Sequence, residues 1–332
     1  MPRRSLVHLA PEADRIAIMR LVWTTLFFAA ACPPVACAGG SGSDLSVMSF
    51  NCWYQFTKVH DGIPKAVAAI REGGADVVGL QECSVETAEK LAGALGFHRV
   101  KSGTGGAQII SRFPILETFG VTGIDPTRSV ASRIRTGGTD GREFILYNIH
   151  LDAGHYGPYA ARPAGATATQ VLEEEAKSPR TAQMTGILGS MAGHLAQSDA
   201  TPVILTGDFN SPSHLDWVEK TSASHSGVAD VPWPATVLPF QAGLVDSFRL
   251  LHPDPAAAPG NTWSTIHKEG EPQDRIDYIF HKGTTIRPVS SRTFNTSVAK
   301  TIGVWGCDIS PVVDNAWPSD HAAVITVYRF GK

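Results

Sequence analysis

Side chains that can bind a metal ion or transfer a proton recur in this chain where apolar segments end. They are found at six segment ends and comprise Asn51, Glu82, His150, Asp208, Asn210, Asp277, Asp320 and His321. A single acidic residue in such a place is commonly a turn cap, and a single histidine is commonly a hydrogen-bonded structural residue. That explanation would have to hold independently at all six places. The set therefore predicts one shared chemical site.

Phosphoester hydrolysis is the reaction that suits these residue types. The substrate is anionic, the attacking water is a poor nucleophile, and the transition state concentrates charge on non-bridging oxygens. Hard carboxylate and amide oxygens suit Mg²⁺, with Mn²⁺ as an alternative. We expect Glu82 to be the main metal ligand, with Asn51 and Asp320 as its neighbours.

The other residues of the set suit proton transfer and phosphate binding. His321 is the candidate general base, and Asp277 would orient its ring and stabilise the imidazolium. Asp208 can share this duty by holding or deprotonating the water, and the division between Asp208 and His321 stays open. Asn210 would donate an amide hydrogen bond to a non-bridging oxygen. His150 would stabilise developing charge or protonate the leaving oxygen.

Hydrophobic periodicity predicts the elements that position these groups. Glycines end the first two predicted helices, and residues 153–163 form a Gly-, Pro- and Tyr-rich loop beside a strand end. No internal repeat or composition break is present, so we expect residues 39–332 to form one domain. The expected strands are 45–51, 76–82, 107–111, 143–150, 202–210, 275–280 and 322–328, and the expected helices are 63–72, 85–95, 178–196 and 240–251.

The order of the motifs resembles the endonuclease/exonuclease/phosphatase superfamily, and the resemblance covers nearly the whole of residues 39–332. The motifs are Ser-Phe-Asn51, Leu-Gln-Glu82, Asn-Ile-His150-Leu, Gly-Asp208-Phe-Asn210-Ser, Arg-Ile-Asp277-Tyr-Ile and Ser-Asp320-His321. The resemblance implies an α/β, DNase I-like four-layer sandwich, in which two mainly antiparallel sheets pack face to face between helices. It also implies a phosphoester substrate, either nucleic acid or a phospholipid or sugar phosphate.

The N-terminal residues predict export. Met19-Arg20 is followed by a mainly apolar run at 21–31 and then by Ala36-Cys37-Ala38, which is the layout of a secretory signal peptide. Eleven residues are too few to span a bilayer, which needs about 20. We expect cleavage after Ala38, a periplasmic or secreted mature protein without a transmembrane anchor, and an upstream extension at 1–18. Lipidation at Cys32 or Cys37 is the alternative.

The charge balance favours a small substrate or weak nuclease activity. The formal charge of −3 comes from 28 basic and 31 acidic residues, and removing residues 1–38 deletes four Arg, one Glu and one Asp, which gives −5. Neither 153–177 nor 217–239, the segments expected to determine specificity, is markedly basic. This pattern speaks against tight binding of a long polyanion.

Some nearby residues have two interpretations. Asp152 and His155 either touch substrate or only face solvent, and Tyr156 and Tyr159 either stack on a base or sugar or simply pack. Arg112, in Ser-Arg-Phe-Pro, is expected to form a structural ion pair.

Three cysteines lie outside the predicted signal peptide. Cys52 and Cys83 each follow a site residue, so a disulfide between them is conceivable in an oxidising compartment, whereas Cys307 has no assigned role. Trp53, two positions after Asn51, departs from the pattern of abasic-site endonucleases in the superfamily and makes DNA repair a poorer fit.

A protein that keeps this fold only to bind a partner or ligand is the competing interpretation. Such a protein would be expected to lose at least one metal-binding or proton-transfer group, because the fold does not require them. All of these groups are present here.

Overall fold

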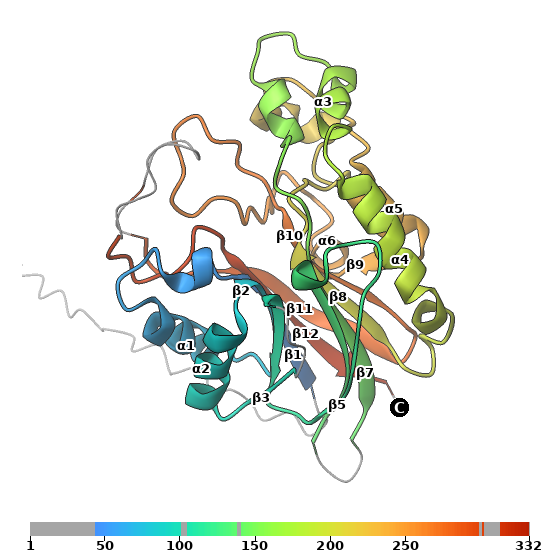
Figure 1. Ribbon diagram of the computed structural model, residues 1–332. Helices are drawn as coiled ribbons and strands as arrows, with labels where there is room; N and C mark the ends of the chain where they lie inside the picture. Colours follow the sequence, from blue (N-terminus) through green and yellow to red (C-terminus); the bar gives the residue numbers. More distant parts are fainter. Residues whose placement is uncertain (1–43, 101–104, 138–140, 299–300, 302–312, 332) are drawn as a thin grey trace, which may run out of the picture. The chain divides into compact units, whose positions relative to one another are not determined.

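Two six-stranded sheets form the centre of the protein (Figure 1). The computed structural model describes residues 44–100, 105–137, 141–298, 301 and 313–331, and residues 40–332 group into one compact unit. In spatial order the first sheet contains β11 (Ile286–Phe294), β12 (Ala323–Phe330), β1 (Asp44–Asn51), β2 (Val77–Cys83), β4 (Gly106–Ser111) and β3 (His98–Arg99). The second contains β5 (Ile115–Phe119), β6 (Ser129–Arg135), β7 (Glu143–His150), β8 (Val203–Asp208), β10 (Asp277–Lys282) and β9 (Val245–Asp246).

Each sheet has one parallel pair and is otherwise antiparallel. The parallel pairs are β1 with β2 and β7 with β8. In each parallel pair both strands end at the same edge of the sheet. Asn51, Glu82, His150 and Asp208 lie at those ends, and Asn210 follows one of them, whereas Asp277 begins β10 and Asp320 and His321 precede β12.

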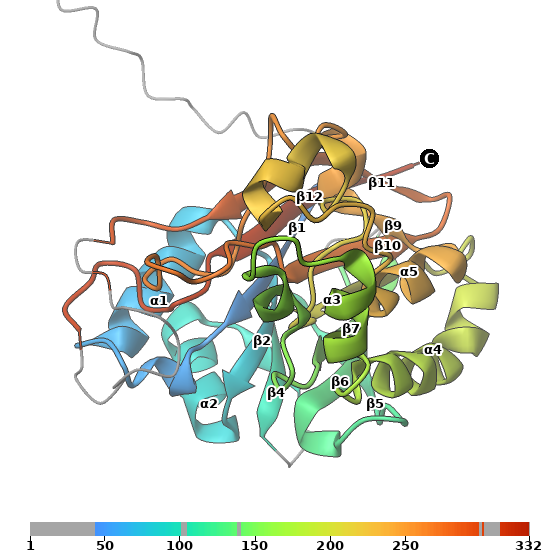
Figure 2. The ribbon, with the colours of Figure 1, turned by 90° about the horizontal axis from the view of Figure 1, so that it is seen from above.

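Helices cover the outer faces of the two sheets (Figures 1 and 2). The helices of the described residues are α1 (Gly62–Gly73), α2 (Val85–Leu95), α3 (Ala168–Glu175), α4 (Arg180–Ala196), α5 (Pro234–Gln241) and α6 (Ser247–Leu251), with short helices η1 (Tyr54–Phe56), η2 (Pro126–Arg128), η3 (Gly157–Ala161) and η4 (Glu219–His225). Helices α1 and α2 pack on the first sheet, and α4 and α5 pack on the second. The expected four-layer sandwich is therefore confirmed. No helix in the described ranges combines the length and apolar character needed to cross a membrane.

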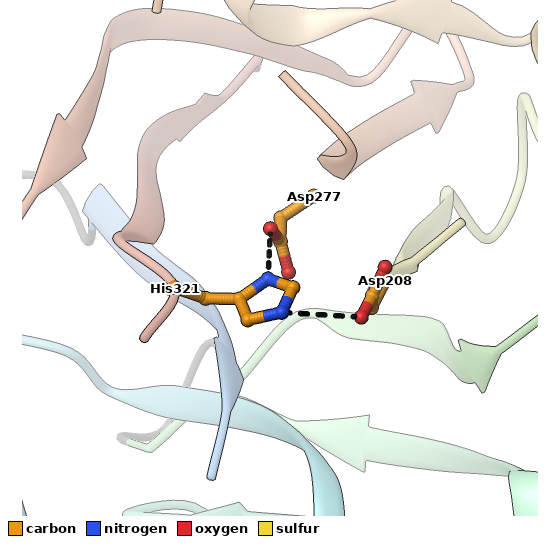
Figure 3. Close-up of side chains that lie close together, drawn as sticks. All are labelled: Asp208, Asp277 and His321. Atoms are coloured by element: carbon orange, nitrogen blue, oxygen red, sulfur yellow. Dashed lines mark hydrogen bonds and ion pairs between the residues drawn. The ribbon is translucent and has the colours of Figure 1, made fainter. Parts of the chain in front are cut away.

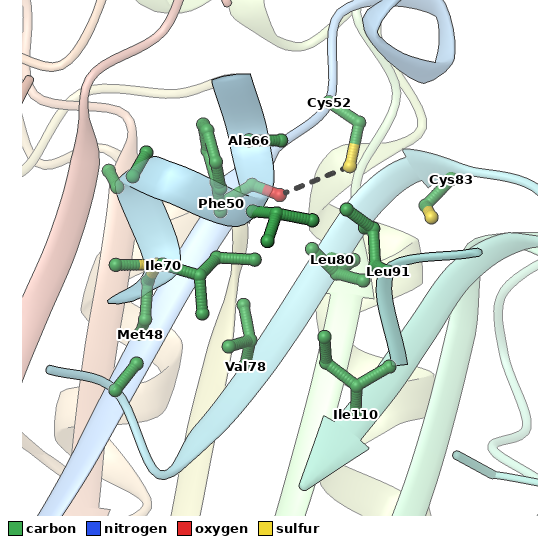
Figure 4. Packing of buried hydrophobic residues seen from close by; sticks show 14 of the residues in the cluster. Met48, Phe50, Cys52, Ala66, Ile70, Val78, Leu80, Cys83, Leu91 and Ile110 are labelled. Carbon is green, nitrogen blue, oxygen red and sulfur yellow. Dashed lines mark hydrogen bonds between the residues drawn. The ribbon is translucent and has the colours of Figure 1, made fainter. Parts of the chain in front are cut away.

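Strand alternation explains why both faces of the first sheet are buried. Leu45 and Val47 of β1 belong to the core between the sheets, while Met48 and Phe50 belong to the core under α1 and α2 (Figure 4). At about 25 cal/mol per Å² of buried apolar surface, these cores supply the main driving force for folding.

A polar bridge joins the two sheets close to the site. The Gln81 side chain donates to Asn148 Oδ1 over 2.6 Å, and Asn148 donates to the Leu80 carbonyl over 2.8 Å. The Thr206 hydroxyl also donates to Asn148 Oδ1, over 3.1 Å. A Cβ at Gly79 would lie 2.3 Å from Thr206 Oγ1, so glycine is required where the sheets approach. The bridge fixes the strand ends of one sheet against those of the other.

The expected helix at 240–251 is wrong. Helix α5 ends at Gln241, Gly243 adopts a left-handed φ of 81°, and β9 intervenes before α6 begins. The Asp246 carboxylate starts α6 by accepting from two backbone N–H groups of its first turn. The apolar residues at the end of α5 and in α6 are spaced as in a single helix, which is why the sequence predicted one. Strands β3, β5, β6 and β11 and helix α3 were not predicted.

Candidate active site

Strand pairing brings predicted site residues from distant parts of the chain together. In the second sheet Asp208 pairs with His150 on one side and with Asp277 on the other. In the first sheet the end of β1 places Asn51 beside the end of β2, and His321 lies two residues before β12. These residues converge because the strands that carry them end at the same edge of the sandwich.

Asp277, His321 and Asp208 form a line for proton transfer (Figure 3). His321 Nδ1 lies 2.9 Å from Asp277 Oδ2, and its Nε2 lies 3.8 Å from Asp208 Oδ2. All three are buried. Burial alone would lower the pKa of His321, but the two carboxylates outweigh it and raise the pKa to about 10. The imidazole is therefore a strong base held between two anions.

Asp208 is the centre of a wider hydrogen-bond network. Its Oδ2 accepts from Asn51 Nδ2 over 2.9 Å and lies 3.6 Å from His150 Nε2. Its Oδ1 accepts from the backbone N–H of Asn210 over 2.8 Å. Asn210 has φ 47°, a left-handed conformation that asparagine tolerates better than most residues. These contacts fix the Asp208 carboxylate at the floor of the site.

Glu82 is held by an irregularity in β2. The pairing of β2 with β4 shifts register between Leu80 and Cys83, and Glu82 has a left-handed φ of 52°. Such bulges redirect a side chain and are frequent beside active sites. The backbone N–H of Tyr54 donates to Glu82 Oε2 over 2.7 Å. The strained backbone thus presents the carboxylate to the site.

Glu82 and Asp320 are carboxylates of the kind that a divalent cation needs. Asp320 is 2% exposed, and its Oδ1 has no hydrogen-bond partner within the described ranges. Burial raises the pKa of Asp320 well above its usual range, and the negative charge of Glu82 adds to the increase. A cation would relieve this repulsion and satisfy the buried oxygen. The residues therefore fit a hard divalent metal.

Asn51 is oriented differently from a metal ligand. The Trp53 N–H donates to Asn51 Oδ1 over 2.9 Å, so the amide nitrogen faces Glu82 and Asp208. To act as an oxygen ligand, the amide would have to turn. Its role as a ligand stays a prediction.

A second group with metal-ligating atoms coincides with the proton-transfer line. Ligand atoms of Asp208, Asp277 and His321 lie within 4.8 Å of one another. Asp277, however, is engaged with the His321 ring, and Mg²⁺ prefers oxygen to imidazole ligands. The two carboxylates of Glu82 and Asp320 are therefore closer to the all-oxygen ligand set that magnesium prefers. Asp208, a member of the line, is joined to Glu82 through the Asn51 amide, which donates to both carboxylates.

A cleft of about 450 Å³ exposes most of these side chains. Six of the eight predicted residues line it, namely Glu82, His150, Asp208, Asn210, Asp320 and His321. Asn51 and Asp277 are fully buried behind them. The predicted set is therefore one site and its supporting contacts.

Sequence reasoning missed several residues of the cleft, and Arg128 and Trp263 are the two that bear on the chemistry. Arg128, at the end of η2, is the only Lys or Arg that lines the cleft within the described part of the chain, and it donates to the Leu151 carbonyl over 3.1 Å. The Trp263 ring centroid lies 4.8 Å from that of His321. Neither residue ends a periodic apolar segment, which was the signal used for the others.

The loop after β7 contributes Tyr156 and Tyr159 to the cleft. Asp152 and His155 do not line it: Asp152 Oδ1 accepts from the Gly154 N–H over 2.8 Å, and His155 Nδ1 lies 2.9 Å from Glu174 Oε1. Both therefore support the loop.

Buried Arg180 also holds this loop. It donates to the carbonyls of Asp152, Gly154 and His155 and pairs with buried Glu175. Elsewhere, Arg112 forms the expected ion pair, with its Nη1 lying 3.0 Å from Asp76 Oδ1.

Cys52 and Cys83 are buried free thiols, so the conceivable disulfide is not formed. The Cys52 thiol donates to the Phe50 carbonyl over 3.8 Å (Figure 4), and that of Cys83 to the Ser84 carbonyl over 3.5 Å. Burial raises the pKa of Cys52 well above its usual range. Cys307 lies outside the described residues, as does the predicted signal peptide.

Residues 48–321 match the model of the Endonuclease/Exonuclease/phosphatase family. The chain belongs to this family. It is also 30% identical over 312 residues to the uncharacterized protein F14F9.5 of Caenorhabditis elegans, which covers 87% of this chain and 93% of that protein.

Solved structures of the Endonuclease/Exonuclease/phosphatase family share the fold. Truncated TDP2 of Caenorhabditis elegans superimposes with a TM-score of 0.55 at 17% identity, covering 87% of this chain and 98% of that one. A family protein of Bacteroides thetaiotaomicron gives a TM-score of 0.53 at 18% identity, with 88% and 99% covered. Family membership supports phosphoester hydrolysis as the class of reaction, and the model match spans every predicted site residue.

Proposed function

We propose that this protein is an exported, Mg²⁺-dependent hydrolase that directs water in line onto the phosphorus of a small phosphoester. One observation carries the proposal. The proton-transfer line of Asp277, His321 and Asp208 and the carboxylates of Glu82 and Asp320 meet in a single cleft. Export rests on the sequence of residues 19–38 alone.

Glu82 and Asp320 would hold the metal. A bound divalent cation supplies positive charge against the non-bridging oxygens and makes water easier to deprotonate. Asp320 Oδ1 lies 4.0 Å from His321 Nε2, so the metal-binding carboxylates adjoin the proton-transfer line.

The chain's own residues would move the proton and stabilise the phosphate. Asp208 and the Nε2 atom of His321 face each other across 3.8 Å, and either can take the proton of the attacking water. Asp277 stabilises the resulting imidazolium. One amide hydrogen of Asn210 binds the Leu151 carbonyl, which leaves the second for a non-bridging oxygen. His150 lines the cleft beside Asp208 and can donate to the phosphate or the leaving oxygen.

The cleft favours a small substrate over a nucleic-acid duplex. Its volume of about 450 Å³ falls in the range of small-ligand pockets, about 300–1,000 Å³. Proteins that bind long nucleic acids use many Lys and Arg contacts to phosphates, whereas among the described residues Arg128 is the only Lys or Arg that lines the cleft. One guanidinium group, that of Arg128, suits a substrate with one phosphoryl group.

Hydrolysis of a substrate panel tests the proposal. Plasmid DNA, RNA, sphingomyelin, inositol phosphates and bis-p-nitrophenyl phosphate are each incubated with the purified protein in Mg²⁺, Mn²⁺ or EDTA. His321→Ala is run in parallel, with His98→Ala as the matched control because His98 is exposed and lies outside the cleft. We expect EDTA-sensitive turnover that His98→Ala keeps and His321→Ala loses.

Absence of hydrolysis and of metal binding would favour the alternative that this chain is a non-catalytic binding protein. Equal signals from wild type and His321→Ala, together with no Mg²⁺ or Mn²⁺ binding by calorimetry, would contradict hydrolysis.

A further inference from the structure

Three aromatic residues form one side of the cleft, and we call them the aromatic wall. They are Tyr156, Tyr159 and Trp263, and Ile276 packs with them. Tyr156 precedes η3, Tyr159 lies within it, and Trp263 belongs to the segment before β10. Trp263 also packs against the His321 ring, whereas no role has yet been given to the two tyrosines.

The polar atoms of the aromatic wall are all engaged by two acidic residues. Tyr159 OH donates to Glu271 Oε1 over 2.8 Å, and Trp263 Nε1 donates to the same oxygen over 2.9 Å. Tyr156 OH donates to Asp274 Oδ2 over 2.9 Å. Glu271 and Asp274 are 5% and 3% exposed. Because both hydroxyl groups and the indole N–H are already hydrogen-bonded, the wall can contact a ligand only through the carbon atoms of its rings.

These contacts also hold the wall rigidly. Tyr156 and Tyr159 meet edge to face, with centroids 5.3 Å apart. Asp274 also accepts from Trp217 Nε1 over 2.8 Å, and the Arg162 guanidinium stacks 4.1 Å from the Tyr159 centroid. Side chains fixed before binding lose little entropy when a ligand arrives. A fixed aromatic surface of this kind favours a partner with matching geometry.

The wall adjoins the proton-transfer line. The Trp263 ring lies 4.8 Å from the His321 ring, and Arg128 and Asn210 line the same cleft. A phosphoryl group held at His321 and Asn210 would leave the organic part of the ester against the wall. The wall is therefore placed to select the organic group of the substrate.

We propose that the substrate carries an aromatic ring close to its phosphoryl group and that this ring packs against the aromatic wall. Aromatic rings have a negative face and a positive edge, so they gain directional contacts with a face or an edge of the wall that a saturated chain cannot make. A sugar would bring hydroxyl groups, and the wall's own polar atoms are already bonded to Glu271 and Asp274. This inference rests on the proposed phosphoester hydrolase function.

Binding of a matched series of phosphonates tests the wall without requiring turnover. Calorimetry in Mg²⁺ compares 2-phenylethylphosphonate with 2-cyclohexylethylphosphonate, ethylphosphonate and a hexose 6-phosphonate. The first two have similar size and differ in whether the ring is aromatic. We expect the phenyl compound to bind about tenfold more tightly than the ethyl compound and about threefold more tightly than the cyclohexyl compound.

Variants at the partly buried Tyr159 assign the preference to the wall. Tyr159→Leu should reduce the phenyl-to-ethyl affinity ratio to about two, and Tyr159→Phe should retain most of it, because the ring and not the hydroxyl makes the contact. Phe240→Leu is the matched control, since Phe240 is 57% exposed and lies outside the cleft. Thermal unfolding of each variant verifies that it is folded.

The corresponding phosphate monoesters and their methyl diesters separate the two proposals. Turnover of these esters without a phenyl preference would overturn the aromatic-ring inference and leave the hydrolase intact. A phenyl preference in binding with no turnover of any ester would support the wall and contradict the hydrolase. Equal binding of the phenyl and cyclohexyl compounds, tightest binding of the hexose compound, or an unchanged ratio in Tyr159→Leu would each refute the inference.

Discussion

Replacing Asp277 with Asn should weaken the base at His321 in a way that can be measured as a function of pH. The pKa of His321 rises from 6.5 to about 10 because its carboxylate neighbours outweigh burial. That difference corresponds to roughly 5 kcal/mol in favour of the imidazolium. Asp277 is the nearer of the two carboxylates, at 2.9 Å against 3.8 Å for Asp208. Asp277→Asn should therefore remove roughly half or more of this stabilisation, about two pH units in the pKa.

The expected consequence is a changed profile of kcat/KM against pH. His321 must be unprotonated to accept a proton from water, so the acid limb of the profile follows its pKa. In Asp277→Asn this limb should move to lower pH, while the plateau above it falls on the order of 10²–10⁴-fold because the imidazolium is less stabilised. At low pH the lower pKa and the lower plateau have opposite effects on the activity of Asp277→Asn, because a larger fraction of His321 is unprotonated in the variant. The loss of activity should therefore grow as pH rises.

The assay is kcat/KM for the best substrate between about pH 5 and 10 at one fixed Mg²⁺ concentration. Asp314→Asn is the matched control, because Asp314 is 79% exposed and pairs only with Lys65 among the ion pairs of the described chain. Urea unfolding checks that Asp277→Asn is folded. Activity of Asp277→Asn within about threefold of wild type at about pH 10, or an acid limb at the same pH as in the wild type, would refute the assignment of His321 as the base stabilised by Asp277.

Three further predictions follow from other parts of the molecule. Glu82→Gln should abolish metal-dependent turnover and weaken Mg²⁺ binding in calorimetry, and full activity in this variant would exclude Glu82 as the main ligand. Arg180→Met should lower the free energy of unfolding by about 3–5 kcal/mol in urea titrations, because it leaves the buried Glu175 carboxylate unpaired; a loss below about 1 kcal/mol would contradict this. In EDTA, the stability that His321 contributes should be complete below pH 6.5 and disappear as pH rises to about 10, because its folded-state pKa is raised above the unfolded value. Urea unfolding across this range should show that loss in the wild type and a flatter profile in His321→Ala.

The layers of the fold and the central strands could be predicted because their residues carry a periodic signal. Strand β7 is a largely apolar run that is buried on both faces, and Gly74 and Gly96 end α1 and α2 in left-handed conformations. The family motifs then supplied the arrangement that periodicity alone cannot give. Strand β5 was missed because it is short and largely exposed, and β6 was missed because serine and arginine interrupt its apolar residues although most of the strand is buried.

The residues proposed for proton transfer and metal binding could be predicted from the sequence, whereas Arg128 and Trp263, on the part of the cleft proposed to contact the substrate, could not. His150 and Asp208 end strands, and the register of the second sheet determines where they lie. Arg128 and Trp263 lie in segments whose positions depend on tertiary contacts. Nothing in the local sequence indicates that residues so far apart face one cleft.

These two halves depend on different interactions. The strand-borne residues are held by backbone pairing, which continues through both sheets. The loop-borne residues are held by buried charges, such as Arg180 against the carbonyls of the loop after β7 and Glu271 against Tyr159 and Trp263.

Buried charges are costly unless every polar atom is paired, so a loop held in this way tolerates few alternative conformations. The loop is stabilised by its local contacts and not by the hydrogen bonds between strands. Exchanging such a loop can therefore change the organic group that the cleft accepts while Asp208, Asp277 and His321 keep their positions.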